Sequence, residues 1–320
     1  GPETHRIFGH ALARQIADCW DRLGRPAPFV VREEGAGSGT LARDILGGLW
    51  NERPESLPAM RYELNDVNAA RVAEGVERLG ADGIAQVAVA STEETITGVL
   101  LANELLDAFP VHRLVVRDDG LREVYVTWRD GWFTDDEGSI SSNDLTAPVD
   151  GLVLSDGQRL EVSPAAWGWA RSIGSSLQRG YAILIDYGFP AGELYSPVRF
   201  PDGSLRTYSG HLVGDDPYRR VGRQDLTTHV DFTAISRAAE AGGCRVLGLT
   251  SQAHFFAGLG IEELLLDLQQ SSTDLPDYLN ARETIMHLLD PRALGRFRVL
   301  VLGKSVSDNP PLRGLSFALR

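Results

Sequence analysis

Apolar and polar positions form two patterns along the chain: a spacing of three and four residues that is typical of amphipathic helices, and short continuous apolar runs that are typical of buried strands. Over residues 5–23 the apolar residues recur at three- and four-residue intervals, which predicts a helix. The continuous apolar run at 98–103 is bounded by polar residues and predicts a strand covered on both faces. Because strands and helices of these kinds alternate, we predict an α/β fold with a doubly wound, mostly parallel sheet.

The predicted sheet has seven strands, at residues 28–31, 61–65, 85–90, 98–103, 181–186, 245–249 and 297–302. Further helices are predicted at 40–50, 67–79, 163–178, 231–241 and within 251–289. Residues 111–153 break the alternation with short strands and Asp-Gly turns, which predict inserted antiparallel hairpins. Residues 188–228 are rich in Gly, Pro, Asp and Arg and predict a long irregular stretch. We expect one domain over 1–320, with a hairpin insertion at about 111–160 and an irregular insertion at about 188–230.

Charge and cysteine content narrow the class of function. The formal net charge of -13 argues against a nucleic-acid partner, since phosphate binding draws on clustered Lys and Arg, but it is compatible with a basic peptide. Cys19 and Cys244 are isolated, so we expect no disulfide framework, no metal site and a reduced, cytoplasmic setting. No apolar run approaches the roughly 18 to 20 residues that span a bilayer, and the first residues lack a targeting pattern, so no membrane partner is expected.

A glycine loop directly after the first predicted strand carries the main candidate chemistry. Residues 33–39 read Glu-Glu-Gly-Ala-Gly-Ser-Gly and separate a strand from a helix, where a nucleotide- or nucleoside-binding loop belongs. The spacing is GxGxG, whereas the dinucleotide fingerprint is GxGxxG, which counts against an NAD-dependent oxidoreductase without removing it. Glu33 suits a ligand with a cationic amino-acid group. Asp66, at the end of the second strand, could accept hydrogen bonds from two ribose hydroxyls.

The segment at 103–110 follows the fourth strand at its carboxyl end, the edge where open α/β sheets bind ligands. Asn103 could contact the amino-acid part of such a cofactor. Glu104 and Asp107 could hold a cationic acceptor or take its proton. The alternative is that both acids only begin a helix and interact with its dipole.

Matching segments along nearly the whole chain point to a known family. They are Pro2-Glu3-Thr4, Phe8-Gly9, Gly24-Arg25-Pro26, the loop at 33–41, Leu101-Ala102-Asn103-Glu104, Asp107-Ala108-Phe109-Pro110-Val111, Ile185-Asp186-Tyr187-Gly188, Leu226-Thr227-Thr228-His229-Val230-Asp231-Phe232, Thr250-Ser251-Gln252, Gly260-Ile261 and Gly295-Arg296-Phe297. Together they resemble the MidA-like family of S-adenosylmethionine-dependent methyltransferases, whose mitochondrial members are respiratory complex I assembly factors that methylate a protein arginine. The chain departs from the family pattern at Glu34, where an apolar residue is usual, and at Asp66-Val67-Asn68, where Glu-Val-Ser is more usual.

The resemblance implies a Rossmann-like class I methyltransferase fold and S-adenosyl-L-methionine as cofactor. The cofactor-binding residues are then expected to be Glu33, Gly35, Ala36, Gly37, Gly39, Asp66, Val67 and Asn103. Near the acceptor we expect the catalytic candidates Glu104, Asp107 and His229 and the substrate-binding candidates Asp186, Tyr187, Arg206 and His211. Arg206 and His211 are chosen from the irregular stretch, where polar residues are usually only solvated. His229 could pair with Asp231, although Asp231 could equally cap a helix.

The expected reaction is direct methyl transfer to a nitrogen or oxygen, in which the enzyme positions the partners and a carboxylate or His removes a proton. Protein arginine is the first acceptor implied by the resemblance, and a peptide or small-molecule acceptor is the second. A non-catalytic assembly or binding protein that keeps the fold, and a homodimer, stay open. The four tryptophans Trp128, Trp132, Trp167 and Trp169 are expected to pack in the core and the hairpins.

Overall fold

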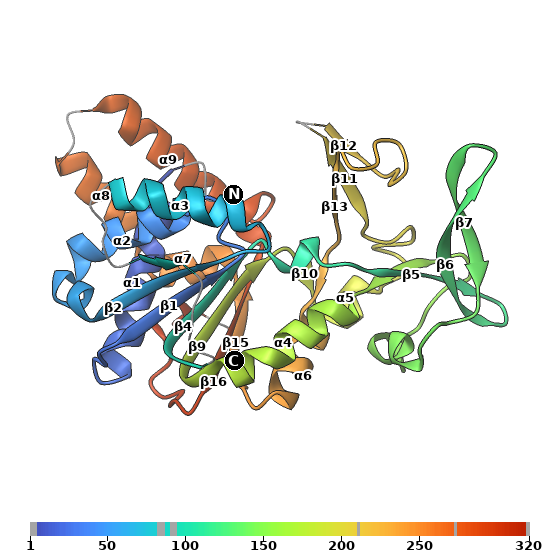
Figure 1. Ribbon diagram of the computed structural model, residues 1–320, viewed down its shortest axis with the longest axis horizontal. Helices are drawn as coiled ribbons and strands as arrows, with labels where there is room; N and C mark the ends of the chain where they lie inside the picture. Colours follow the sequence, from blue (N-terminus) through green and yellow to red (C-terminus); the bar gives the residue numbers. More distant parts are fainter. Residues whose placement is uncertain (1–4, 82–86, 90–94, 210–211, 272–273, 318–320) are drawn as a thin grey trace. The chain divides into compact units, whose positions relative to one another are not determined.

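The computed structural model describes residues 5–81, 87–89, 95–209, 212–271 and 274–317. The chain forms two compact units, which are described separately (Figure 1). Unit 1 comprises Gly1–Glu104, Ser172–Asp186 and Gly242–Arg320, and unit 2 comprises Leu105–Arg171 and Tyr187–Ala241. The insertions predicted at about 111–160 and 188–230 both fall within unit 2.

Unit 1 contains a seven-stranded sheet in the order β15-β16-β9-β4-β1-β2-β3 (Figure 1). Its strands are β1 (Phe29–Glu34), β2 (Met60–Asn65), β3 (Val87–Val89), β4 (Ile96–Asn103), β9 (Leu177–Asp186), β15 (Arg245–Ser251) and β16 (Arg298–Lys304). All pairings are parallel except those of β16, which runs antiparallel to both of its neighbours. The predicted doubly wound, mostly parallel sheet is confirmed. Residues 85, 86 and 90 of the predicted third strand lie outside the described residues.

The helices of unit 1 flank this sheet and bury one continuous apolar core. They are α1 (Ile7–Arg22), α2 (Thr40–Glu52), α3 (Ala69–Ala81), α7 (Gln252–Gly258), α8 (Ile261–Ser271) and α9 (Leu275–Leu289), while α4 (Pro164–Ser176) contains residues of both units. Helix α1 ends where the sequence predicts, because Gly24 follows it with a φ of 82°. None of the helices formed by the described residues has the length and apolar character needed to cross a bilayer.

Unit 2 begins with a four-stranded antiparallel sheet in the order β7-β6-β5-β8. Its strands are β5 (His112–Arg117), β6 (Gly120–Arg129), β7 (Trp132–Gly138) and β8 (Arg159–Val162). The β6–β7 turn is Asp130-Gly131, with φ values of 53° and 85°, as a two-residue type I′ turn requires. The predicted hairpins are therefore confirmed.

The stretch that we predicted to be irregular contains further short elements. They are β10 (Gly188–Phe189), α5 (Ala191–Leu194), β11 (Arg206–Ser209), β12 (Leu212–Gly214) and β13 (Asp225–Thr227), followed by β14 (Val230–Asp231) and helix α6 (Phe232–Ala241). Strands of two to four residues are too short to show a period of two, so the apolar pattern did not predict them. Unit 2 also has an apolar core of its own, which includes Leu114, Leu160 and Tyr195.

Candidate functional site

The strand register of unit 1 brings the carboxyl ends of four strands to one edge of the sheet. Glu34 at the end of β1 lies opposite Asn65 of β2 and Ala102 of β4. Asn103 at the end of β4 lies opposite Ile185 of β9. The strand order also reverses between β1 and β4, which is the place where open α/β sheets bind ligands. The glycine loop, Asp66 and Asn103 therefore share one edge.

The loop after β1 is a left-handed backbone path held by hydrogen bonds to β2 and the residue that follows it. Gly35, Gly37 and Gly39 have φ values of 71°, 54° and 73°, a conformation that favours glycine. The Ala36 N–H donates to the Asn65 carbonyl oxygen at 3.1 Å. A Cβ on Gly39 would lie 3.1 Å from Leu64 Cδ1, whereas a Cβ on Gly37 would have no neighbour within 4 Å. The loop is thus tightly packed at Gly39 and open at Gly37.

Asp66 fixes the loop to β2. Its Oδ2 accepts a hydrogen bond from the Gly37 N–H at 2.9 Å, and its Oδ1 accepts one from the Asn68 N–H at 2.8 Å. The side chain is only partly buried, and a carboxylate has about four acceptor positions, so both oxygens can also accept from hydroxyl groups. Val67 is fully exposed at 106%, and its cofactor contact stays a prediction.

Glu33 is a buried acid directly before the glycine loop. It is 4% exposed, and the Tyr62 hydroxyl donates to its Oε2 at 2.7 Å. Burial raises the pKa of Glu33 to about 8, although the bond from Tyr62 opposes this. Near neutral pH this carboxyl therefore holds a proton for much of the time, and an adjacent cation would favour its ionised form. No local pattern in the sequence indicates Tyr62 as its partner.

Glu104 has a strained backbone at the end of unit 1. Its φ of 50° lies in the left-handed region, which a residue with a side chain seldom adopts, and its N–H donates to the Ile185 carbonyl oxygen at 2.9 Å. Such strain is typical of functional positions. Leu106–Ala108 forms a three-residue 3-10 helix with Asp107 in its first turn, whereas Glu104 lies outside it, so of the two acids only Asp107 stands at a helix start, and that helix is too short to have an α-helix dipole.

Asp186 lies at the end of β9 in unit 1 and is 1% exposed. This burial leaves little of its carboxylate surface for a substrate. Its substrate-binding role stays a prediction.

In unit 2 the structure brings Asp107 and Tyr187 together across 80 positions of sequence. The Tyr187 hydroxyl donates to Asp107 Oδ2 at 2.7 Å, and the Thr228 N–H donates to the Asp107 carbonyl oxygen at 3.0 Å. Asp107 is buried in this arrangement. The pair offers a carboxylate whose position is fixed by a phenol.

His229 lies among aromatic rings in unit 2. Its ring centroid is 5.2 Å from that of Tyr187, 5.5 Å from that of Phe189 and 5.2 Å from that of Phe200. Asp231 Oδ1 accepts from the Thr233 and Ala234 N–H groups at 2.9 and 3.0 Å and so caps α6. The capping alternative for Asp231 is confirmed, and these contacts favour a packing role for His229 over a His229–Asp231 base.

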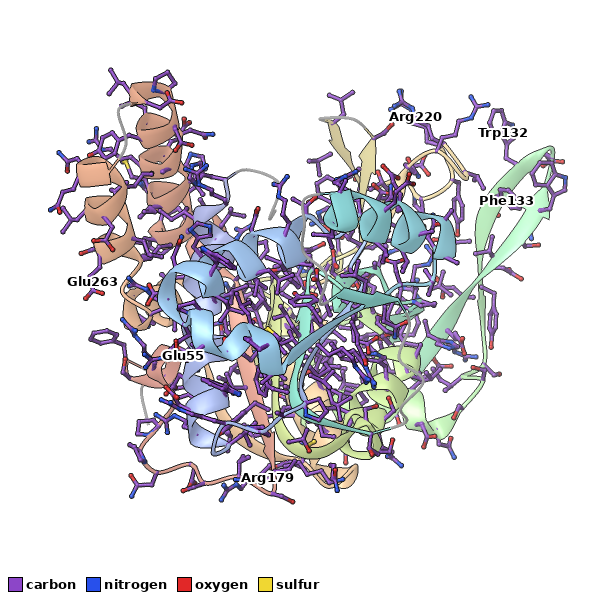
Figure 2. The ribbon with its side chains drawn as sticks, turned by 60° about the vertical axis from the view of Figure 1, so that its left-hand side comes forward. Glu55, Trp132, Phe133, Arg179, Arg220 and Glu263 are labelled. Carbon is purple, nitrogen blue, oxygen red and sulfur yellow. The ribbon has the colours of Figure 1, made fainter. Side chains whose placement is uncertain are left out.

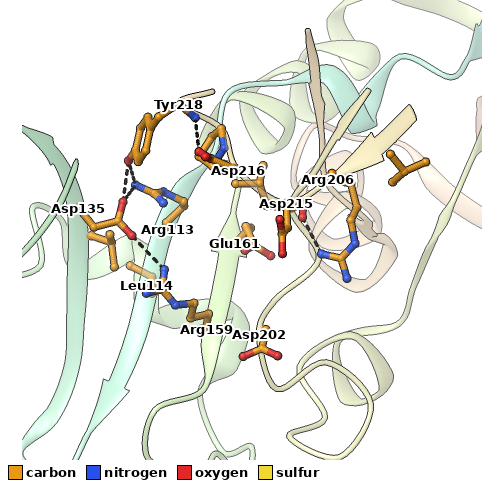
Figure 3. Close-up of a pocket in the computed structure, with 15 residues that line it drawn as sticks. Arg113, Leu114, Asp135, Arg159, Glu161, Asp202, Arg206, Asp215, Asp216 and Tyr218 are labelled. Carbon is orange, nitrogen blue, oxygen red and sulfur yellow. Dashed lines mark hydrogen bonds and ion pairs between the residues drawn. The ribbon is translucent and has the colours of Figure 1, made fainter. Parts of the chain in front are cut away.

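Unit 2 also contains two neighbouring hollows. One is an apolar groove of about 470 Å³ that includes Asp107, Phe109, Val126, Phe133 and Leu226 in its walls. The other is a cavity of about 770 Å³ with many charged residues, shown in Figure 3. Arg206 lies in this cavity, where its guanidinium donates to the Leu205 carbonyl oxygen at 2.6 Å. His211 lies outside the described residues.

Comparison with known proteins now decides the family. A family profile described as "Putative S-adenosyl-L-methionine-dependent methyltransferase" matches residues 11–250. The chain belongs to this methyltransferase family. A COG1565 superfamily protein from Burkholderia thailandensis, solved with S-adenosylhomocysteine bound, is 31% identical to the methyltransferase, with a TM-score of 0.90 over 100% of this chain and 81% of that one.

Curated relatives agree with this assignment. The protein arginine methyltransferase NDUFAF7 of Xenopus tropicalis is 26% identical over 98% of this chain and 78% of its own length. Its Drosophila melanogaster homolog is 28% identical over 98% and 77%. The resemblance, the class I fold, the enzymatic activity and the S-adenosylmethionine cofactor are confirmed. The expected cytoplasmic location is wrong: both relatives are named as mitochondrial proteins, and two isolated cysteines indicate only a reducing compartment.

The sheet edge of the methyltransferase fits the chemistry of its cofactor. The loop is open at Gly37, where a ligand can approach the backbone. Asp66 can accept from ribose hydroxyls, and the raised pKa of Glu33 fits a group that gains a cationic neighbour on binding.

Proposed function

We propose that this methyltransferase transfers a methyl group to an arginine nitrogen of a protein acceptor. The names of the relatives that align over nearly the whole chain support the acceptor class. Within the structure, the observation that carries the proposal is Asp107, which lines an apolar groove and accepts a hydrogen bond from the Tyr187 hydroxyl. When bound, S-adenosylmethionine supplies a sulfonium methyl group, to which the acceptor nitrogen bonds while the S–C electron pair returns to sulfur.

The residues of unit 2 account for binding of a guanidinium. This group is a planar cation with five N–H donors and no acceptor, so it requires carboxylate or carbonyl oxygens. Asp107 offers a carboxylate, and the hydrogen bond from Tyr187 fixes its orientation. Burial in a largely apolar wall strengthens a charge-assisted hydrogen bond to such an acid.

A carboxylate is also needed to accept a proton. A guanidinium stays protonated at physiological pH, so its nitrogen must lose a proton as the new N–C bond forms. We propose Asp107 and Glu104 as the carboxylates that can accept this proton. Asp107 is also the acid that holds the acceptor. Correct positioning then supplies most of the rate enhancement.

A small-molecule or peptide nitrogen or oxygen is the second candidate acceptor. The groove of about 470 Å³ falls within the usual size range of small-ligand pockets, which favours this alternative. A homodimer stays open as the working form, and sedimentation of the purified chain decides it.

Radiolabelled S-adenosylmethionine with arginine-containing peptides and matched lysine-containing peptides tests the proposal. We expect label on arginine, identified by mass spectrometry of the hydrolysed product. Asp107→Asn should lower the rate about 10²- to 10⁴-fold with unchanged cofactor affinity, while Asp118→Asn, an exposed acid in the β5–β6 turn, should behave as wild type. Label on lysine or on a small molecule, or an unchanged rate in Asp107→Asn, would contradict the proposal.

A further inference from the structure

The apolar groove and the charged cavity of unit 2 adjoin each other. Arg113, Leu205, Pro217 and Tyr218 line both of them. The Arg113 guanidinium donates to the Tyr218 hydroxyl and, at 2.7 Å, to Asp135 in the charged cavity (Figure 3), and Arg113 and Tyr218 also line the groove. The two hollows therefore form one continuous, two-part surface.

One face of the β6–β7 hairpin supplies part of the groove. Cross-strand partners share a face of a sheet, and Trp128 pairs with Phe133 while Val126 pairs with Asp135. Val126 and Phe133 line the groove, and Asp135 lines the cavity. Val126 is 57% exposed and Phe133 is 40% exposed, so the wall presents apolar side chains to solvent. Apolar patches of this kind mark interaction sites.

The opposite face of the same hairpin belongs to neither hollow. It contains Trp132, which pairs with Arg129 and is 74% exposed. Figure 2 shows Trp132 and Phe133 near the turn of the hairpin. The expected hairpin packing is found for Trp128, whose ring contacts Phe133 edge to face, although Trp128 and Trp132 are both largely exposed and lie outside the core. Near its turn the β6–β7 hairpin is a two-stranded ribbon, which has too few neighbouring elements to cover these side chains.

The cavity has an excess of acids over bases. Asp135, Glu161, Asp202, Asp215 and Asp216 face three arginines, Arg113, Arg159 and Arg206. Arg113 and Arg159 both pair with Asp135, at 2.7 and 3.0 Å, while Arg206 donates to a carbonyl oxygen. Among the described residues, Asp202 and Asp215 form no ion pair with a side chain. The negative charge of the cavity agrees with the net charge of -13 on the whole chain.

We infer that unit 2 recognises its acceptor as a basic polypeptide segment, with an apolar side chain in the groove and basic residues facing the acid-lined cavity. This inference rests on the proposed function, because Asp107 is itself part of the groove wall. The apolar anchor supplies affinity through burial, and the acids select basic sequences over neutral or acidic ones. The groove and the cavity therefore determine which protein segment is methylated.

Fluorescence anisotropy with labelled peptides tests this recognition without requiring methyl transfer. The first set of probes consists of arginine-centred peptides with basic flanks, in which a single leucine is placed in turn at each of the four positions on either side. The second set has serine in place of leucine, and the third keeps the leucine but has glutamate in place of the basic flanking residues. We expect the basic leucine set to bind about tenfold or more tightly than either other set.

Substitutions at two adjacent residues provide a test variant and its matched control. Phe133→Asp should weaken binding of the basic leucine set about tenfold, whereas Trp132→Asp, on the opposite face of the hairpin, should bind as wild type. Leu226→Ser, in β13, should reproduce the Phe133→Asp loss from a different element. Near-UV circular dichroism and thermal unfolding, unchanged in all three variants, show that unit 2 remains folded, and unchanged calorimetry with S-adenosylmethionine shows that unit 1 does.

Equal binding of the leucine and serine sets, or equal effects of Phe133→Asp and Trp132→Asp, would overturn the inference. A dimer that Phe133→Asp dissociates in sedimentation would assign the groove to a second copy and would also overturn it. Methyl transfer to arginine without dependence on Phe133 leaves the proposed function standing and removes only the inference. Phe133-dependent peptide binding without methyl transfer to arginine would support the inferred peptide-binding surface and contradict the proposed function.

Discussion

The glycine loop of unit 1 and the groove of unit 2 are built from different kinds of interaction. The loop is held by its main-chain N–H groups, which donate to the Asn65 carbonyl oxygen and the Asp66 carboxylate, and it follows the end of a buried strand. The groove is walled by half-exposed side chains such as Val126 and Leu226, the second of which lies on a strand of only three residues. A substitution in the loop changes the backbone path, whereas a substitution in the groove changes only a surface.

This difference separates two tasks within one chain. A cofactor that is the same in every turnover is served by a fixed main-chain cradle, because its contacts need to be positioned only once. An acceptor-binding surface made of side chains can be altered by substitution at small cost to folding, since exposed positions usually change stability by less than about 0.5 kcal/mol. The variants below test whether the two tasks are in fact separable.

Gly37→Val should have the largest effect. A β-branched residue at a φ of 54° is strained by about 1–2 kcal/mol and its side chain would occupy the open side of the loop, so calorimetry should detect no cofactor binding. Gly157→Val in unit 2 is the matched control, because Gly157 has a φ of 78° and also no neighbour within 4 Å of an added Cβ. Equal losses of cofactor affinity in both variants would contradict a specific role for Gly37.

Tyr187→Phe should have an intermediate effect. It removes the hydroxyl that donates to Asp107 but keeps the ring next to His229, so the fold of unit 2 should be preserved. We expect kcat for the acceptor to decrease about tenfold, a loss of roughly 1.4 kcal/mol in positioning, with the cofactor Kd unchanged. If kcat stays at the wild-type value, Tyr187 does not position Asp107.

Glu33→Gln should have the smallest effect, seen mainly in pH dependence. Since burial raises the pKa of Glu33 from 4.5 to about 8, the folded, cofactor-free protein retains a proton that the unfolded chain loses. The contribution of Glu33 to stability is thus greatest below about pH 4.5 and declines as pH rises toward 8. Urea unfolding between pH 5 and 9 should show this decline in wild type and a weaker one in Glu33→Gln.

The pH dependence of cofactor affinity also tests Glu33, and affinity should rise with pH where stability declines. A cationic ligand group beside Glu33 favours the carboxylate, so binding should release a proton and wild-type affinity should rise between about pH 6 and 8. Glu55→Gln, an exposed acid on unit 1 labelled in Figure 2, should keep the wild-type profile. A flat wild-type profile would place the cationic group of the cofactor away from Glu33.

The parts of the fold that the sequence predicts are those set by local patterns. The run at 98–103, the loop at 33–39 and the Asp-Gly turn at Asp130 each have one structural solution that their own residues favour. Asp66 was predicted at the loop because parallel strands place their carboxyl ends at a common edge.

Other features depend on contacts between distant segments. The Tyr62–Glu33 bond joins two strands, and the Asp107–Tyr187 bond spans 80 positions, so neither bond has a local signal. The left-handed backbone conformation at Glu104 could not be predicted, because the residue is not a glycine. The exposure of the hairpin tryptophans was not predicted, because apolar character alone does not show whether a neighbour exists to cover a side chain.

A paired measurement on Asp66→Ala and Phe133→Asp tests the central claim that unit 1 binds the cofactor and unit 2 selects the acceptor. Cofactor Kd is measured by calorimetry, and acceptor KM is measured at saturating S-adenosylmethionine with the basic leucine peptides. The account predicts that Asp66→Ala weakens only cofactor binding and that Phe133→Asp raises only the acceptor KM. A variant that changes both constants equally, or a Phe133→Asp protein that loses its cofactor, would contradict it.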